Sequence, residues 1–369
     1  MTIETNTFTV KPARRVRGVR AYRRGTSSEN SITLWLDANE GASLPATLLN
    51  EILSPDPEVV RKYPDAARVE ARIASRWGLD PVDGAARVVL TNGGDDAIDR
   101  ICRSVLEPGR TAVVHEPSFE MIRRSAQLAG AEVRGVQWVD GIFPTREFIN
   151  QIDDRTGLVA LVTPNNPTGL AIPTSDLLEI SAAAQGVGAA ALIDLAYAEF
   201  AENDPTRELL RLENVVIVRT FSKAWGMAGL RVGYAIAGGP LADWVRTAGG
   251  PFPVSGLALR AVELALKQSE GPENYVIRAV CRVQAARTEL TSLLQELGAH
   301  PIESQANFVL VRVGDAPAVD RGLRGLGIAV RAFDSKPELV NTVRITVPSE
   351  PVEYQRLEAA LRASERVSR

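Results

Sequence analysis

The stretch Val218-Arg219-Thr220-Phe221-Ser222-Lys223-Ala224-Trp225-Gly226-Met227-Ala228-Gly229-Leu230-Arg231 decides how this chain is interpreted. It begins at the end of an apolar, β-branched run, residues 215–218, and therefore leaves a buried strand. Burial beside a strand favours the neutral amine of Lys223, a nucleophile that can form a Schiff base. Ser222 and Arg231 can hold a phosphate as hydroxyl donor and forked cation, while Gly226 and Gly229 permit tight backbone. The simpler alternative is a turn with a solvated lysine.

Composition excludes several classes of protein. The chain has 369 residues, 45% of them hydrophobic and 24% charged, with a formal net charge of −3. This is ordinary for a globular protein of roughly two domains, and it argues against a nucleic-acid partner. With no apolar run of transmembrane length and no signal-peptide core, we expect no membrane partner and a cytoplasmic location.

The residue types that bind metals or form disulfides are scarce. Cys102 and Cys281 fall in helical patterns and are predicted to be core thiols. The two histidines, His115 and His300, lack ligand-like neighbours, so we expect no metal site and no histidine-based triad.

The order of the elements predicts the fold class. From position 87 onward strands alternate with helices, which is typical of an α/β protein with a mostly parallel sheet and helices on both faces. We expect an N-terminal arm over 1–35, a large domain over 36–270 and a smaller α+β domain over 271–369. A long helix over about 274–297 would connect the two domains, and the arm would join the smaller one.

Polar side chains follow the predicted strands, and the carboxyl ends of parallel strands gather functional groups. Gly93-Gly94-Asp95-Asp96 opens a helix whose N–H groups suit a phosphate, although taken alone the turn is better explained by simple capping. Phe119 can stack on a flat ring or pack in the core. Asn166 lies in a Pro-rich turn, and Asp194 ends a strand where a buried carboxylate needs a cation. Tyr197 lies three residues beyond it.

Taken together, these segments resemble the fold-type I, pyridoxal-phosphate-dependent aminotransferases, and most of all their histidinol-phosphate aminotransferase branch. The resemblance covers residues 36–347 and is carried by nine segments. They are Leu36-Asp37-Ala38-Asn39-Glu40, Tyr63-Pro64-Asp65, Asn92-Gly93-Gly94-Asp95-Asp96, Pro164-Asn165-Asn166-Pro167-Thr168-Gly169, Asp194-Leu195-Ala196-Tyr197, Thr220-Phe221-Ser222-Lys223-Ala224, Gly229-Leu230-Arg231-Val232-Gly233-Tyr234, Asn307-Phe308 and Val343-Arg344-Ile345-Thr346-Val347.

The resemblance implies a role for each candidate site residue. Lys223 would bind the cofactor covalently and act as general base, Asp194 would pair with the pyridine N–H, and Tyr197 and Asn166 would bond the ring hydroxyl. Phe119 would stack on the ring, and the phosphate would lie among Gly94, Asp95, Ser222 and Arg231. Tyr63 would reach the phosphate of a neighbouring subunit, which implies a homodimer with shared sites. Asn39, Tyr22, Arg331 and Arg344 would contact the substrate.

Four departures from the family pattern lie where loops that face the substrate are expected. They are Leu195 in place of glutamate, Gly41-Ala42 in place of x-Pro, Phe252-Pro253-Val254-Ser255 where asparagine often precedes the valine, and Pro348 in place of glycine. On this interpretation they leave the cofactor unaffected and bear on the choice of substrate.

The leading hypothesis is an aminotransferase that moves an amino group between histidinol phosphate, or a related small amine or amino acid, and a 2-oxo acid. The alternative is a pyridoxal-phosphate enzyme of a specialised amino-acid pathway that transaminates another amino acid or performs decarboxylation, elimination or cyclisation. A regulator built on this fold would need a DNA-binding domain, and the arm lacks helix-turn-helix patterning. The sequence does not name the amino donor or acceptor.

Overall fold

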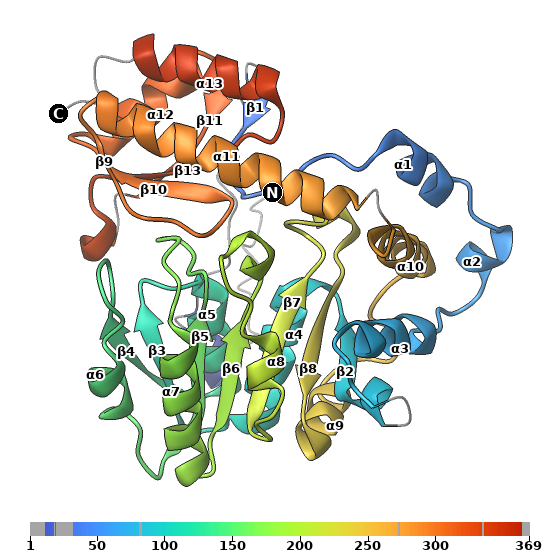
Figure 1. Ribbon diagram of the computed structural model, residues 1–369. Helices are drawn as coiled ribbons and strands as arrows, with labels where there is room; N and C mark the ends of the chain where they lie inside the picture. Colours follow the sequence, from blue (N-terminus) through green and yellow to red (C-terminus); the bar gives the residue numbers. More distant parts are fainter. Residues whose placement is uncertain are drawn as a thin grey trace, which may run out of the picture.

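Two sheets of different size organise the molecule (Figure 1). The computed structural model describes residues 12–17, 19, 32–80, 83–271, 274–333 and 336–363. The larger sheet is built from the middle of the chain, and the smaller one, drawn in orange and red, lies above it with the C-terminal helices.

The larger sheet has seven strands in the order β2-β8-β7-β6-β5-β3-β4. All its neighbours pair in parallel except β8, which is antiparallel to both β7 and β2. The predicted mostly parallel sheet is therefore confirmed. Its strands are β2 (Val88–Thr91), β3 (Thr111–Glu116), β4 (Glu132–Gln137), β5 (Thr156–Val162), β6 (Ala190–Asp194), β7 (Val215–Thr220) and β8 (Gly233–Ala237).

Helices cover both faces of this sheet, as expected because its central strands are buried throughout. One face packs against α4 (Gly93–Val105), α5 (Glu120–Ala129) and α9 (Gly239–Thr247). The other face packs against α6 (Thr145–Ile149), α7 (Thr174–Gly186) and α8 (Thr206–Leu209). Strands β5, β6 and β7 contribute to both apolar clusters because successive side chains point to opposite faces.

The smaller sheet has the order β12-β13-β10-β9 and is antiparallel. Its strands are β9 (His300–Pro301), β10 (Phe308–Arg312), β12 (Arg331–Phe333) and β13 (Thr342–Thr346). The helices nearby are α11 (Tyr275–Glu296), α12 (Ala316–Gly325) and α13 (Pro351–Ala363). The chain changes strand partners at Val330. Strand β11 (Ile328–Ala329) pairs with β1 (Leu34–Trp35), and β12 pairs with β13.

The remaining helices form a group beside the larger sheet (Figure 1). There α1 (Ala46–Leu53), α2 (Pro57–Arg61) and α3 (Ala67–Arg76) pack against α10 (Gly256–Ser269). Short 3-10 turns are η1 (Arg14–Val16), η2 (Gly84–Arg87), η3 (Ala198–Phe200), η4 (Ala228–Leu230) and η5 (Pro337–Leu339). The domain limits at 35/36 and 270/271 remain a prediction.

Two further expectations concern the chain as a whole. Cys102 is buried as predicted, but Cys281 is exposed on α11, so its assignment to the core is wrong. The helical pattern of the surrounding residues was correct, yet Cys281 lies on the face of α11 that points to water. In the part of the chain that the structure describes, no helix combines the length and apolar character needed to cross a membrane.

Candidate active site

A cavity of about 610 Å³ collects the predicted site residues. Its walls combine the carboxyl ends of β6 and β7, the start of α4 and strands β12 and β13 of the smaller sheet. Twelve of the fourteen predicted residues line it: Asn39, Gly94, Asp95, Phe119, Asn166, Asp194, Tyr197, Ser222, Lys223, Arg231, Arg331 and Arg344. Tyr63 does not line it, and Tyr22 lies outside the described residues.

Lys223 lies in the turn that follows β7. Its Nζ donates to the carbonyl oxygen of Ala38 at 3.0 Å and lies 5.6 Å from the centroid of the Tyr197 ring. The turn is closed by Gly226, whose N–H donates to the Lys223 carbonyl at 3.0 Å and whose φ of +68° favours glycine. A Cβ at Gly41 would collide with the same carbonyl, so the segment 38–41 is pressed against the lysine turn.

Asp194, the last residue of β6, brings a carboxylate into the cavity wall at 4% exposure. Burial raises the pKa of Asp194 to about 7, opposed by the N–H of Ala196, which donates to its Oδ1 at 3.0 Å. Asp95 raises this pKa further, and Lys223 lowers it. A cationic group placed in the cavity would therefore stabilise the ionised carboxylate.

The hydroxyl of Tyr197 receives two amide donors. Asn39 Nδ2 donates to it at 3.0 Å and Asn166 Nδ2 at 3.4 Å. Asn39 has a φ of 55° and is anchored by Thr346, whose Oγ1 accepts from its backbone N–H at 3.0 Å. With both lone pairs engaged, the Tyr197 proton is available to an acceptor in the cavity.

Another wall of the cavity is suited to an anion. The first turn of α4 presents backbone N–H groups at Gly94 and Asp95, where the helix dipole favours negative charge. Arg231, in a left-handed conformation with φ 54°, donates to Ser222 Oγ at 3.4 Å and pairs with Asp95 Oδ2 at 3.3 Å. Its guanidinium lies so close to Gly93 that a Cβ there would have to displace it.

The smaller sheet contributes cations from the opposite side. Arg344 on β13 is 8% exposed and donates to Asn166 Oδ1 and to the carbonyl of Asp37, both at 2.6 Å. Arg331 on β12 is its direct cross-strand neighbour and is exposed. The pairing of β12 with β13 thus places the two arginines next to each other.

Lys336 also lines the cavity, and sequence reasoning missed it. It lies in the connection between β12 and β13 and belongs to none of the motifs. The one signal in the sequence is that Lys336 comes five residues after Arg331. Among the residues that the structure describes, neither Arg331 nor Lys336 has a carboxylate partner. Two cations that line the cavity without an ion-pair partner among the described residues indicate an anionic ligand.

Tyr63 lies on the surface, away from the cavity of its own chain. Its side chain is 82% exposed and stacks on Phe252, with ring centroids 4.6 Å apart. Phe252 is itself 56% exposed and lines a second hollow of about 330 Å³ with Arg100 and Arg246. That Tyr63 reaches a neighbouring subunit remains a prediction.

None of the four departures from the family pattern lines the main cavity. Leu195 is fully buried among the apolar residues between β6 and α7, and Pro348 is buried. Gly41 and Ala42 pack against the lysine turn, and Phe252 stacks on Tyr63. Within one chain, the expectation that they face the substrate is therefore wrong. A position just after a strand does not tell whether a side chain lines the cavity or packs behind its wall.

Comparison with known proteins agrees with the geometry. Residues 36–361 match the family model "Aminotransferase class I and II". A histidinol-phosphate aminotransferase of Haloferax volcanii is 34% identical over 80% of this chain and 80% of its own. A second, from Mesorhizobium japonicum, is 33% identical over 88% and 89%. The crystal structure of the Sinorhizobium meliloti histidinol-phosphate aminotransferase in complex with pyridoxal-5'-phosphate superposes with a TM-score of 0.78, at 25% identity over 90% and 92% of the two chains.

Proposed function

This chain belongs to the aminotransferase class I and II family, and on that premise we propose that it transfers an amino group from histidinol phosphate, or a closely related phosphorylated amine, to a 2-oxo acid. It is a pyridoxal 5'-phosphate-dependent transferase. The observation that carries the choice of substrate is the set of cations on the smaller sheet side of the cavity, Arg331, Lys336 and Arg344.

The cavity residues fit the cofactor. The buried Asp194 carboxylate would face its pyridinium nitrogen, and the Tyr197 proton would be donated to the ring oxygen. The α4 N-terminus, Ser222 and Arg231 would hold its phosphate. When bound, the cofactor supplies an aldehyde for the amino group and a ring that accepts electrons from the substrate's Cα.

Lys223 would hold the cofactor covalently until the substrate amine displaces it. The freed amine would then move a proton from the substrate Cα as general base. Its hydrogen bond to the Ala38 carbonyl, at 3.0 Å, holds the amine at the wall of the cavity. Asp194 would keep the opposite end of the cofactor positively charged throughout.

A phosphate dianion accepts several charge-assisted hydrogen bonds, whereas a carboxylate is satisfied by a single arginine. Arg344 already donates to Asn166 and Asp37, whereas Arg331 and Lys336 line the cavity without an ion-pair partner among the residues that the structure describes. We therefore favour a phosphorylated substrate. The specialised-pathway alternative rests on the four departures, none of which lines the cavity.

The test is a steady-state assay of a panel of amines with 2-oxoglutarate as acceptor. Histidinol phosphate should give the highest kcat/KM, and histidinol, which lacks only the phosphate, should be much poorer. Equal turnover of both, or turnover confined to an unphosphorylated amino acid, would contradict the proposed substrate class without touching the cofactor assignment.

We further propose a homodimer in which Tyr63 of one subunit contacts the cofactor phosphate of the other. The exposed Tyr63–Phe252 stack supports this, because large aromatic side chains in water mark contact surfaces. A cytoplasmic location is proposed on the resemblance to biosynthetic enzymes.

A further inference from the structure

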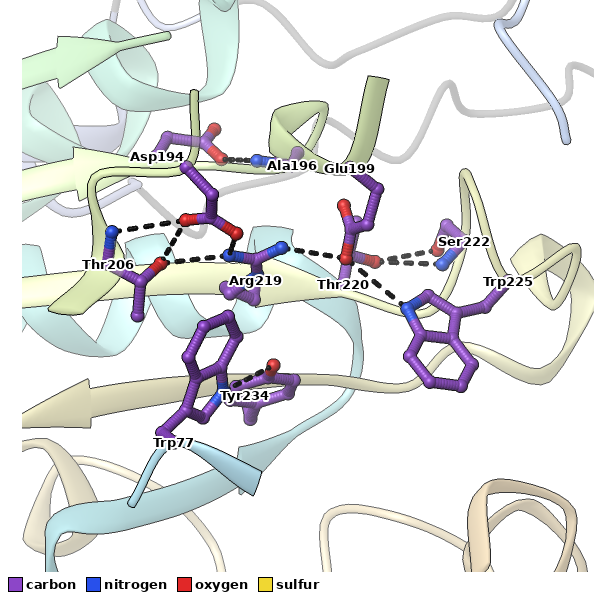
Figure 2. A network of polar contacts seen from close by, with 11 residues as sticks. Trp77, Asp194, Ala196, Glu199, Thr206, Arg219, Thr220, Ser222, Trp225 and Tyr234 are labelled. Atoms are coloured by element: carbon purple, nitrogen blue, oxygen red, sulfur yellow. Dashed lines mark hydrogen bonds and ion pairs between the residues drawn. The ribbon is translucent and has the colours of Figure 1, made fainter. Parts of the chain in front are cut away.

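A buried guanidinium lies four residues before Lys223 in the chain (Figure 2). Arg219, on β7, is 2% exposed, and its Nη1 contacts Asp204 Oδ2 at 2.6 Å and Thr206 Oγ1 at 2.9 Å. Its Nη2 contacts Glu199 Oε1 at 2.8 Å, and its face covers the Trp77 ring at 4.7 Å. Burial alone would lower the pKa of Arg219, but Glu199 and Asp204 raise it above its usual range. The group is thus a fixed charge.

One carboxylate oxygen joins this charge to the lysine turn. Glu199 Oε1, which contacts Arg219, also accepts from Trp225 Nε1 at 3.3 Å, as Figure 2 shows. Trp225 lies two residues after Lys223, and Glu199 lies two residues after Tyr197. A single atom therefore ties the turn after β7, which carries Lys223, to the turn after β6, which carries Tyr197 and begins directly after Asp194.

We propose that Arg219 is a positioning residue for the reaction and acts through Glu199 and Trp225. Trp225 is 4% exposed and lies edge-on to Phe221, so its indole has one orientation, which the Glu199 carboxylate selects. Fixing Trp225 fixes the backbone of the lysine turn, and with it the distance from the Lys223 amine to Asp194 and Tyr197. Small misplacements of a reacting group cost large factors in rate.

None of Arg219, Glu199 and Trp225 lines the cavity, so each acts on the chemistry only through its neighbours. The inference rests on the proposed role of Lys223 and is independent of which amine is the substrate.

Two tryptophans provide a matched test. Trp225→Phe and Trp77→Phe each remove one indole N–H, but Trp77, whose ring lies against Arg219, donates to Tyr234 Oη at 3.2 Å rather than to Glu199. Trp225→Phe should lower kcat about tenfold or more while KM changes less than about threefold, and Trp77→Phe should stay within about twofold on both. The pH at which the bound cofactor changes its visible absorption should move only in Trp225→Phe.

A second pair addresses the charges themselves. Glu199→Gln and Asp204→Asn each remove one of the two negative charges paired with Arg219, but only Glu199 also contacts Trp225. We expect kcat, and the pH at which the bound cofactor changes its visible absorption, to change in Glu199→Gln and to stay unchanged in Asp204→Asn. If Trp225→Phe does not fold, this pair decides the question.

A readout without cofactor separates this inference from the proposed function. In cofactor-free protein, the rate at which formaldehyde and cyanoborohydride methylate Lys223, followed by peptide mass spectrometry, should change in Trp225→Phe and Glu199→Gln but not in their controls. Unchanged labelling in both variants, or equal effects within each pair, would overturn the positioning role. These outcomes stand whether or not the enzyme accepts histidinol phosphate.

Discussion

Removing Arg331 should weaken catalysis on a phosphorylated substrate and spare its unphosphorylated analogue. A hydrogen bond to a charged group contributes about 1.5–3 kcal/mol, and each 1.36 kcal/mol is tenfold in rate. Arg331 lies on the edge strand of the smaller sheet and is exposed, so solvent screens its charge and the lower end applies. We therefore expect Arg331→Ala to lower kcat/KM for histidinol phosphate roughly tenfold.

The assay compares kcat/KM on histidinol phosphate and on histidinol for the parent and the variant. Arg312→Ala is the control, because Arg312 also lies on the smaller sheet, pairs with Asp140 at 2.7 Å and does not line the cavity. It should leave both substrates unchanged.

Lys336→Ala extends the same argument. If Lys336 and Arg331 contact one phosphate, the double variant should lose a factor that differs from the product of the two single losses, since neighbours that share a partner are not additive. Equal losses on the phosphorylated and unphosphorylated substrates, or no loss at all in Arg331→Ala, would refute the phosphate site.

Three other outcomes follow from the site. Asp194→Asn should retain the cofactor, because the phosphate contacts are intact, yet lose nearly all turnover; near-normal activity would refute the role of its charge. In cofactor-free protein, the pKa of Asp194 near 7 exceeds that of an unfolded aspartate, so the free energy of unfolding in urea should fall as the pH rises from about 4 to about 7. Asp194→Asn should remove that part of the slope, and identical slopes would contradict the shift. Mixing Lys223→Ala with Tyr63→Ala chains should restore activity if sites are shared; verified mixed dimers that stay inactive would argue against it.

Local sequence patterns were enough to bring most candidate residues to one cavity. Lys223, Gly94 and Asn166 each follow a strand within a few residues and Asp194 ends one, and parallel strands bring their carboxyl ends to one edge. The topology thus brings residues from separate motifs to the same edge of the sheet, which is why most of the predicted residues line one cavity.

Features that depend on long-range packing were not predictable from those patterns. Strand β8 has the same kind of apolar sequence as its neighbours, yet it runs antiparallel to them. Its direction could not be predicted because a hydrophobic pattern is the same for both strand directions. Lys336 belongs to no motif, and the link from Arg219 through Glu199 to Trp225 joins residues that only the folded sheet brings together. Leu195 was expected to face the substrate because it follows Asp194 in the chain, but it packs behind the cavity wall.

The central claim is that Lys223 holds the cofactor. Borohydride reduction of the purified yellow protein, followed by proteolysis and mass spectrometry, should place the reduced pyridoxyl group on the peptide that contains Lys223, and Lys223→Ala should leave no stable label. A pyridoxyl group on any other lysine of the active parent enzyme would contradict the account.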